Sequence, residues 1–482
     1  MAKQFAGARI KRLRAQLGLS QVEMARRVNL SVSYLNQLEN DQRPLTVTVL
    51  LKLTDTFDVE AGFFSGDSEA RMIADLRSAL ADASALSGTG VFDDAVPVEI
   101  VARFPEVATH LIALTRRLTE VEARDDGTPL DGQMAYERVR DFFYARRNHI
   151  PELDAQAEIL ASRFTAVGAD AEPEARTWLS DELGVRVEIV GHQTPWGDGR
   201  AGFSEIPRRR YDRERKVLEI PGSASPGRRY FQIGVQTAFL RHSDLIDRIV
   251  ASEPGMDEQT RALARVGLAQ YFAGALLLPY ERFLAVARQE RYDVELLAQQ
   301  FGVGFETICH RLSTLQRTGS RGVPFLFLRT DRAGNISKRQ SATAFHFSRA
   351  GGSCPLWVVH RAFESPNRVV RQVAEMPDGR RYLWIAKSVA GRTRGFGAPT
   401  PEFSVALGCA VEDADALVYA DGLNLGSDAR ATPIGAGCRV CDRSDCVQRA
   451  FPQSGAVIEA PENSQGASPY ATFVAGGRRL LA

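Results

Sequence analysis

The feature that most constrains the fold lies near the N-terminus, where residues 19–40 carry the pattern of two short helices joined by a tight turn. Ser20 can cap the first helix, and Glu23 three residues later completes a capping box. Apolar residues at helical spacing predict that one face of this helix is buried: Val22, Ala25 and Val28. The pattern predicts a helix-turn-helix, whose main use is to place one helix in the major groove of DNA.

The second helix of the motif supplies the candidate base-contacting residues. Ser31 can cap it after a turn at Asn29-Leu30, and Leu35 and Leu38 are expected to point inward at i, i+3 spacing. The outer face carries short polar and amide side chains that can reach base edges: Ser31, Ser33, Tyr34, Asn36 and Gln37. We therefore expect this helix to recognise sequence.

Basic residues are concentrated around the motif. Residues 1–44 contain eight Lys or Arg against three Asp or Glu, a surplus of five, in a chain whose net charge is only +1. Because such a patch attracts phosphates, double-stranded DNA is the expected partner. The alternative is a plain four-helix domain with a solvated basic face.

This segment resembles the XRE (lambda-repressor-like) DNA-binding domains, in which a first helix, the two motif helices and a fourth helix form one small core. The resemblance implies that Gln21 and Arg43 hold phosphates while the second motif helix contacts bases. The fourth helix is expected at residues 47–57, where the apolar residues are Leu50, Leu51, Leu53 and Phe57.

Length and composition bound the remainder of the chain. A chain of 482 residues is too long for one core and suggests about three domains. The N-terminus lacks the apolar segment of a signal peptide, and no apolar run approaches membrane-spanning length. Six cysteines in such a chain favour metal or redox chemistry in a reducing compartment over a disulfide framework. We therefore expect a cytoplasmic protein with no membrane partner.

Periodicity beyond the first domain changes from helical to mixed. A Ser/Ala/Gly-rich joint at 78–94 precedes helical patterns at 98–121, 134–144 and 152–164, and helices in this position commonly connect a DNA-binding head to a sensor body or pair two subunits. Short strands are predicted from about residue 178 onward, for example at 185–190 and 216–220.

A second resemblance covers residues 202–316. A hairpin-like stretch at 205–220, a helix at 228–240 and the segment 269–279 together resemble the ImmA/IrrE zinc peptidases. In that family a helix carries HExxH, two zinc-binding histidines with a glutamate base beside them. A third, acidic ligand lies just before the segment that corresponds to 269–279.

The zinc ligands of that family are missing from this chain. Val235 and Phe239 occupy the histidine positions, Gln236 the base position and Leu268 the position of the acidic ligand. These side chains cannot hold a catalytic zinc ion, and His242 alone cannot replace them. We therefore expect no peptidase activity and a scaffold that is retained for binding a ligand.

A helical pair at 297–315 has the periodicity of a second helix-turn-helix. Its outer face is poorly basic, and a similar pattern closes the peptidase scaffold. We therefore expect it to be structural.

Four cysteines form a candidate metal centre. Cys438, Cys441 and Cys446 follow the spacing C-x2-C-x4-C, and Cys409 lies upstream in a Gly-rich context. Three close sulfurs and one remote sulfur suit an iron–sulfur cluster. A structural zinc site, which more often uses two separate pairs, and unligated core cysteines are the alternatives. The two remaining cysteines are expected to be buried small hydrophobes: Cys309 and Cys354.

The order of these parts resembles the short-chain fatty acyl regulator family across nearly the whole chain. Several long strings support the resemblance: residues 139–150 with Leu153-Asp154, 331–341, 351–357 and 437–452. The resemblance implies a DNA-binding transcriptional regulator and not an enzyme, acting on the glyoxylate shunt, the methylcitrate cycle or propionyl-CoA carboxylase. It also implies coenzyme A or a short acyl-CoA as effector and, in some relatives, a 4Fe-4S cluster.

The expected fold is therefore multidomain: an all-α lambda-repressor-like N-terminal domain, a helical linker, an α+β ImmA/IrrE-like domain and an α+β C-terminal domain. The expected boundaries are 1–66 for the DNA-binding domain, 67–150 for the linker or dimerisation region, 151–320 for the degenerate ligand-binding domain and 321–482 for the cysteine-cluster domain. A homodimer or higher homo-oligomer is expected from the type of DNA-binding head.

Coenzyme A needs positive charge for its phosphates. The candidates are Arg163, Lys338 and Arg339, the last two following a turn at 331–335. The triple arginine at 208–210 is more often a solvated strand edge. Three rival functions remain: an iron–sulfur redox sensor, an active zinc peptidase that cleaves a repressor, and an antitoxin-like or phage-type repressor.

Overall fold

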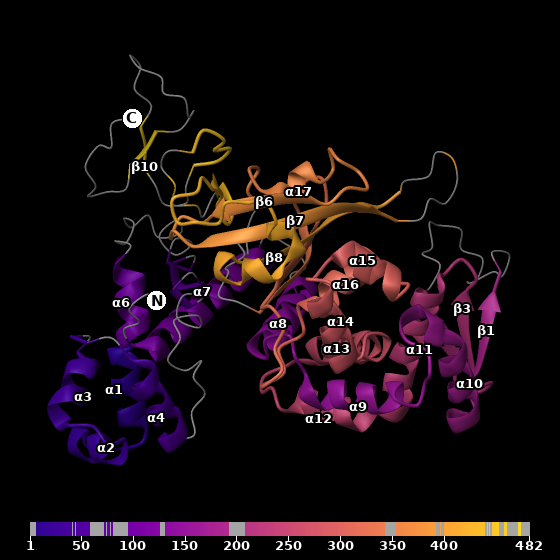
Figure 1. Ribbon diagram of the computed structural model, residues 1–482, viewed down its shortest axis with the longest axis horizontal. Coiled ribbons are helices and arrows are strands. Elements are labelled where there is room, and N and C mark those ends of the chain that lie inside the picture. Colours follow the sequence, from indigo (N-terminus) through magenta and orange to yellow (C-terminus); the bar gives the residue numbers. More distant parts are fainter. Residues whose placement is uncertain are drawn as a thin grey trace. The chain divides into compact units, whose positions relative to one another are not determined.

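The chain forms two compact units in the computed structural model (Figure 1). One comprises Met1–Thr128, Ala344–Phe347 and Ser444–Ala482, and the other Pro129–Thr343 and Ser348–Arg443. The structure describes residues 6–40, 42–43, 45–57, 72–73, 75–77, 79–80, 95–125, 131–191, 208–342, 353–391, 396, 400–438, 441, 443, 446–452, 457–459 and 471–473.

The smaller unit begins with the four expected helices: α1 (Gly7–Gln16), α2 (Gln21–Arg27), α3 (Val32–Glu39) and α4 (Val47–Phe57). Their shared core includes Ile10, Leu13, Met24, Leu35 and Leu53. Helix α4 has the predicted bounds, whereas the side chains of Leu50 and Leu51 lie outside the described residues. The prediction of an all-α head is confirmed.

The two helix caps in this head are as predicted. The Ser20 hydroxyl accepts a hydrogen bond from the Glu23 backbone N–H at 3.2 Å, and Ser31 accepts one from Tyr34 at 3.1 Å. Asn29 has a φ of 51°, a left-handed conformation that asparagine tolerates and that turns the chain between the two helices.

The prediction that Val22 lies in the core of the head is wrong. Val22 is 63% exposed, and Met24 is buried together with Ala25 and Val28. Val22 lies about 200° around the helix from Met24, because successive residues of an α-helix are about 100° apart. The helix therefore buries the face centred on Met24 and Ala25.

A helical hairpin follows in the same unit. The predicted helix at 98–121 is interrupted, giving α6 (Ala95–Arg103) and α7 (Pro105–Asp125). Pro105 explains the break, since proline starts a helix readily but cannot donate a hydrogen bond within one. Leu76, Val101 and Ala108 form the small core. The unit also contains an antiparallel pair of short strands, β10 (Val457–Glu459) and β11 (Ala471–Phe473).

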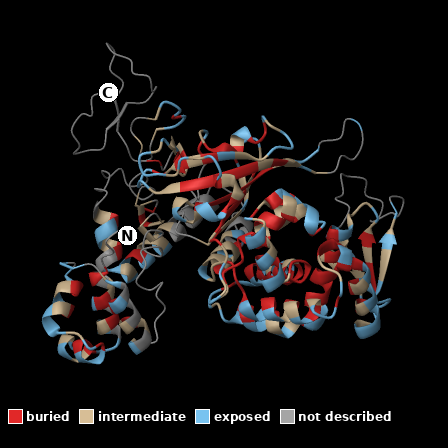
Figure 2. Cartoon of the chain, viewed as in Figure 1, coloured by how far each residue is buried: buried red, intermediate tan, exposed pale blue. Residues whose placement is uncertain are grey.

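The helices of the larger unit pack around one long helix, α13 (Glu258–Leu277), whose C-terminal half is mostly buried (Figure 2). The others are α8 (Asp131–Ala145), α9 (Pro151–Ala161), α10 (Glu172–Leu183), α11 (Pro226–Arg241), α12 (Ser243–Ala251), α14 (Tyr280–Gln289), α15 (Val294–Gln300) and α16 (Phe305–Leu312), with a short 3-10 turn, η2 (Gly168–Ala171). A Cβ placed on Gly234 of α11 would lie 3.0 Å from Ala273 of α13. Glycine therefore allows these two helices to pack closely.

A small three-stranded sheet, in the order β1-β3-β2, adjoins these helices. Strand β1 (Arg186–Val190) pairs in parallel with β3 (Val217–Pro221), and β2 (Arg210–Asp212) pairs antiparallel with β3. The hairpin-like prediction for 205–220 is confirmed over the paired residues, and β2 is left at the edge of the sheet.

The C-terminal part of the larger unit is built on a six-stranded sheet in the order β5-β4-β8-β7-β6-β9. Its strands are β4 (Leu326–Thr330), β5 (Ile336–Ser341), β6 (Val370–Glu375), β7 (Arg381–Ala390), β8 (Glu402–Ala410) and β9 (Thr432–Pro433). The short elements beside it are the helix α17 (Val358–Arg361) and the 3-10 turns η3 (Val411–Ala416) and η4 (Val418–Ala420). The turn predicted between β4 and β5 is present, with Gly334 at a φ of 84°.

The sheet and the helices share one hydrophobic core. That core joins Leu312 and Leu315 of the helical part to Phe325 and Phe327 of the sheet. The predicted boundary at residue 320 therefore does not separate two independent cores.

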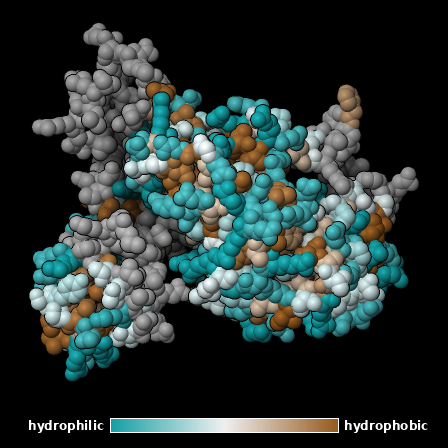
Figure 3. All heavy atoms as spheres, in the orientation of Figure 1, coloured by the Kyte–Doolittle hydropathy of each residue, from teal (hydrophilic) through white to brown (hydrophobic). Residues whose placement is uncertain are grey.

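No single helix within the described ranges is long and apolar enough to cross a membrane, although the bent pair α13 and α14 passes by length and composition. On the face of the larger unit that Figure 3 shows, hydrophilic residues predominate and hydrophobic ones are scattered in small groups.

Candidate functional site

The first candidate site is the outer face of the helix-turn-helix. Gln21 Nε2 donates to Asn36 Oδ1 at 3.2 Å and to Glu39 Oε2 at 3.0 Å. Arg14 Nε in turn donates to Glu39 Oε1 at 2.7 Å, and this hydrogen bond raises the pKa of Arg14. Since Glu39 is buried, the chain of contacts fixes the Gln21 and Asn36 amides at the surface where the two motif helices meet.

The other predicted DNA-contacting residues lie on the same helix or just beyond it. Ser31, Ser33 and Asn36 are exposed, and Tyr34 and Gln37 are half-buried. The exposed Arg43 guanidinium lies 5.7 Å from the Tyr34 ring centre. Leu35 and Leu38 point into the core as predicted, so the polar face is turned outward.

The second candidate site is the position that corresponds to the zinc site of the peptidases. Val235, Gln236 and Leu268 are buried, and Phe239 is half-buried. The Arg209 guanidinium donates from Nη1 to Gln236 Oε1 at 2.6 Å, and its Cζ lies 5.4 Å from the Phe239 ring centre. The cationic side chain of Arg209 therefore contacts the residue at the base position and the residue at one of the two histidine positions.

This placement corrects the interpretation of the triple arginine as a solvated edge. Arg208 and Arg210 are exposed, but Arg209 between them is half-buried and turned onto α11. Alternation along an extended segment explains the difference, because successive side chains point to opposite sides. That alternation is the sequence signal that could have predicted an inward-pointing Arg209.

His242 ends α11 near the same position. Its ring centre lies 4.8 Å from that of Phe272, and burial, together with the charge of Arg241, lowers the pKa of His242 to about 4. Among the residues that the structure describes, no group of three or more His, Cys, Asp or Glu side chains is arranged to hold a metal ion.

The third candidate site is the cysteine segment. Cys354 is buried as expected, but its position near the thiols of this segment was not predicted. Burial raises the pKa of the Cys354 thiol, backbone N–H groups of Gly435 and Leu356 lower it, and the nearby thiols of Cys438 and Cys441 raise it. A Cβ on Gly435 would collide with Cys441 Sγ. Cys354 and Cys441 therefore both lie against Gly435, and Cys438 lies near Cys354.

Cys409 lies on the other side of the sheet. It packs in the shared core with Leu383 and Leu407, whereas the neighbouring Gly408 faces the Trp384 ring. Trp357, three residues after Cys354, packs against Trp384 with ring centres 4.7 Å apart. The structure thus brings Cys354, and not Cys409, near Cys438 and Cys441, and the ligand set expected from sequence stays a prediction. Cys446 is half-buried, and Cys309 is a buried core residue as expected.

The basic residues predicted to hold coenzyme A do not form one cluster of unpaired charges. Arg163 lies 3.5 Å from Glu182, with both side chains about half exposed. Lys338 lies 2.7 Å from Glu306, which also pairs with Arg329 at 3.1 Å. Arg339 is half-buried in β5 beside Lys338 and has a polar partner of its own.

The helical pair at 297–315 is structural, as expected. Leu297, Ile308 and Leu312 are buried in the shared core, and Arg311 is buried with them. The face of α16 that a recognition helix would expose is therefore packed inside the larger unit.

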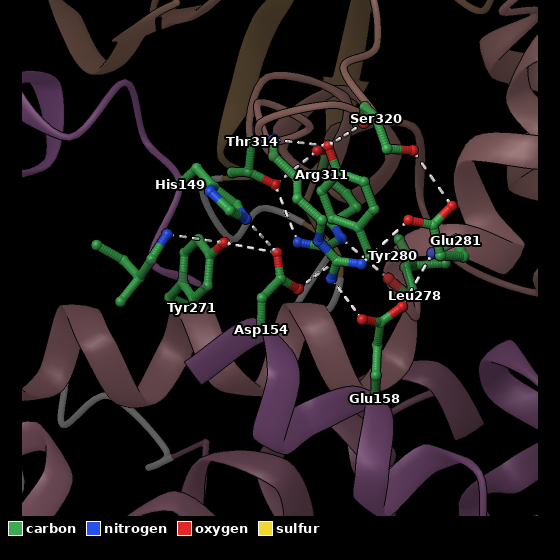
Figure 4. A network of polar contacts seen from close by, with 12 residues as sticks. His149, Asp154, Glu158, Tyr271, Leu278, Tyr280, Glu281, Arg311, Thr314 and Ser320 are labelled. Atoms are coloured by element: carbon green, nitrogen blue, oxygen red, sulfur yellow. Dashed lines mark hydrogen bonds and ion pairs between the residues drawn. The ribbon is translucent and has the colours of Figure 1, made fainter. Parts of the chain in front are cut away.

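A buried polar network was not predicted at all (Figure 4). Asp154 on α9 accepts hydrogen bonds from Arg311 Nη2 at 2.7 Å and from the Tyr271 hydroxyl at 3.0 Å, and His149 Nε2 lies 3.2 Å from the same carboxylate. Tyr271 also accepts the Ile150 N–H at 3.1 Å. The network joins α9, α13 and α16 to the turn that follows α8.

Comparison with known proteins places all three parts of the chain. Residues 10–64 match a helix-turn-helix family, and residues 201–313 match the IrrE N-terminal-like domain. Residues 314–470 match the short-chain fatty acyl coenzyme A regulator family in its C-terminal domain.

Full-length relatives agree with these matches. The HTH-type transcriptional regulator PrpR of Mycobacterium tuberculosis is 47% identical over 98% of this chain and 96% of its own length. RamB of the same species is 42% identical over 98% and 99%, respectively. The propionyl-CoA carboxylase regulator of Cereibacter sphaeroides is 39% identical over 97% and 98%. The chain belongs to the short-chain fatty acyl coenzyme A regulator family.

A solved structure supports the fold of this family member. A transcriptional regulator of Mycobacterium tuberculosis matches with a TM-score of 0.65 and 49% identity, over 70% of this chain and 99% of that one. Because the family's relatives above are transcriptional regulators, this member is an HTH-type transcriptional regulator and not an enzyme. The missing zinc ligands agree with that role.

Proposed function

We propose that this regulator controls genes of short-chain acyl-CoA metabolism of the propionyl-CoA or acetate type, and that coenzyme A or an acyl-CoA alters its binding to promoter DNA. The observation that carries the proposal is the joining of a helix-turn-helix head to a short-chain fatty acyl coenzyme A regulator domain in one chain. The relative named for propionyl-CoA carboxylase supports the metabolic assignment.

The proposed phosphate contacts for coenzyme A are Arg163, Lys338 and Arg339. Each is on the larger unit, and Lys338 is 45% exposed although it pairs with Glu306. A ligand phosphate would therefore compete with the Glu306 carboxylate for Lys338. Such competition costs less at an exposed ion pair than at a buried one.

Thermal unfolding tests the effector. The full chain is heated with free, acetyl-, propionyl-, butyryl- or methylmalonyl-coenzyme A, after anaerobic purification. A ligand at about 100 times its dissociation constant stabilises the native state by about 2.7 kcal/mol, which raises the unfolding midpoint visibly. A selective rise identifies the effector, and the absence of any rise in folded protein contradicts the acyl-CoA proposal.

The second candidate function is an iron–sulfur redox sensor. The nearness of the Cys354 thiol to those of Cys438 and Cys441 favours it, because thiolates are the usual ligands of such clusters. These three described thiols are not arranged to hold a metal ion in the structure, so the proposal requires them to move closer together. We propose a 4Fe-4S cluster with Cys354, Cys438 and Cys441 among its ligands, Cys354 in place of the Cys409 expected from sequence. Zinc is the alternative metal. Regulation that changes in folded cysteine variants would support sensing, whereas loss of folding would indicate a structural metal.

We further propose that the regulator acts in the cytoplasm as a homodimer on two DNA half-sites. Helix α7 supplies the support for self-association. Phe104, directly before this helix, is 60% exposed, Val107 and Leu114 on the helix are 50% and 64% exposed, and Leu111 is half-buried. These four residues follow the alternating spacing of three and four that pairs helices in coiled coils.

A further inference from the structure

The region that corresponds to the zinc site of the peptidases, but lacks the zinc ligands, contains the guanidinium of Arg209. Arg209 lies just before the edge strand β2 and contacts α11 at Gln236 and Phe239, the base position and one histidine position of the peptidase motif. Its neighbours Arg208 and Arg210 point outward. A cationic side chain therefore lies against two of the positions that carry the zinc chemistry in the peptidases.

The charge of Arg209 lacks a carboxylate partner within the part of the chain that the structure describes. It donates a hydrogen bond to the neutral amide oxygen of Gln236 at 2.6 Å. Burial lowers the pKa of Arg209, and among the described residues no charged group offsets that effect. A partly desolvated cation without a counter-ion favours the binding of an anion from solution.

The geometry around this guanidinium suits a small planar anion. Arginine has five N–H donors, and Gln236 accepts only from Nη1, so donors remain for the two oxygens of a carboxylate. The half-buried Phe239 ring lies beside the guanidinium and offers an apolar contact for a short carbon chain. Gln236 fixes the orientation of Arg209 from the buried side.

We propose that Arg209, oriented by Gln236, is the primary contact of a binding site for a small organic carboxylate in the decayed peptidase domain. The carboxylate is either a free short-chain acid or the distal carboxylate of a dicarboxylic acyl thioester. The site goes beyond the proposed effector function, because thioesters of monocarboxylic acids have no free carboxylate to offer.

Calorimetric titration and thermal unfolding of the full chain test the site. The probes are propionate and succinate as free acids, and methylmalonyl-coenzyme A compared with propionyl-coenzyme A. The variants are R209Q, which removes the charge, and Q236E, which supplies an internal carboxylate to Arg209. R208Q is the matched control, since it removes an exposed arginine from the same run.

The expected result is carboxylate binding by the wild type and R208Q that weakens about tenfold or more in R209Q and in Q236E. Binding of succinate or propionate indicates a free acid as ligand. If the wild type prefers methylmalonyl- over propionyl-coenzyme A and R209Q loses this preference, the ligand is the distal carboxylate of an acyl thioester.

Three outcomes would overturn the proposal. They are no carboxylate binding by the wild type, equal binding by all four proteins, and an equal Arg209-dependent response to inorganic phosphate. Q236E keeps the test valid if R209Q does not fold. Binding of free coenzyme A is measured on the same variants. If R209Q loses carboxylate binding but still binds coenzyme A, the carboxylate site is distinct from the effector site proposed above.

Discussion

Arg311 and Asp154 form an ion pair at 2.7 Å in the interior of the larger unit, with side chains only 3% and 0% exposed. Arg311 Nε also donates to the Leu278 carbonyl at 2.9 Å, and Nη1 donates to Thr314 at 3.1 Å. The guanidinium therefore connects α16 to α9 and to the end of α13. Removal of one partner leaves the other charge buried and unpaired.

Asp154→Ala is expected to lower the free energy of unfolding by about 3–5 kcal/mol, because the Arg311 charge loses its counter-ion. Urea unfolding of the full chain, followed in the larger unit by tryptophan fluorescence, measures the change. Glu182→Ala is the control, since it breaks the exposed pair with Arg163 and is expected to change stability by less than about 1 kcal/mol. Similar losses in the two variants would show that the buried pair has no special structural role.

The sequence did not predict the contacts of this buried network. The strings around Asn148-His149 and Asp154 were recognised only through resemblance, with no physical role attached. Their role depends on Tyr271 and Arg311, which are more than one hundred residues away in the sequence. A single sequence contains no signal for such pairing, whereas local signals such as the Ser20 cap and the bounds of α4 were sufficient for the head.

Acidification is expected to destabilise the larger unit between about pH 6.5 and pH 4. Burial lowers the pKa of His242 and of His310 to about 4, so the unfolded chain binds more protons than the native one throughout that interval. The free energy of unfolding therefore rises with pH through this window, and the contribution of the two histidines is fully present above it. Gln340 Nε2 lies 3.0 Å from His310 Nε2, and only the neutral ring can accept this hydrogen bond.

Asp154 contributes to acid sensitivity at lower pH. Burial alone would raise the pKa of Asp154, but the charge of Arg311 and the hydrogen bonds from His149 and Arg311 lower it to about 2. Its stabilising effect is present above the unfolded pKa of about 4 and is lost as pH falls toward 2. Unfolding midpoints between pH 8 and pH 2 should show both steps. His310→Gln should flatten the upper one, and the exposed His110→Gln should leave it unchanged.

Specific DNA binding is expected to depend on the fixed amides of the head. Asn36→Ala and Gln37→Ala should each weaken binding to the operator by about tenfold or more, with little change for unrelated DNA, because base contacts are lost and phosphate contacts remain. Gln21→Ala should produce part of the Asn36 effect, since Gln21 orients that amide. Competition binding at several salt concentrations measures both affinities. Equal losses on operator and unrelated DNA would contradict base recognition by these residues.

Arg43 provides the contrasting case. Arg43→Ala is expected to weaken binding to all DNA sequences alike and to reduce the slope of log affinity against log salt by about one, as for the loss of one phosphate contact. An effect confined to the operator would assign Arg43 to base recognition.

The iron content of anaerobically purified protein should distinguish Cys354 from Cys409. Cys354→Ser is expected to lose most of the iron and the brown colour, because it removes a thiol beside Cys438 and Cys441. Cys409→Ser should retain the iron, since Cys409 faces the core on the other side of the sheet. Retention of iron by the first variant and its loss in the second would restore the ligand set expected from sequence.

Sequence spacing identified Cys438 and Cys441 because they lie close together in the chain. The expected remote ligand, Cys409, is 29 residues upstream of Cys438 (438 − 409), whereas Cys354 is 84 residues upstream of it (438 − 354). The side of the sheet on which each cysteine lies decides between them, and that depends on strand register: Cys409 lies opposite Leu383, and both face the core.

Self-association is expected to depend on the apolar face of α7. Leu114→Asp places a charge on the most exposed residue of that face and should convert dimers to monomers, measured by light scattering during size-exclusion chromatography. Thr109→Asp is the control, because Thr109 is also exposed but lies on the opposite side of the helix. If both variants remain dimeric, the subunits associate through another surface. If both become monomeric, added charge on α7 and not loss of the apolar face is responsible.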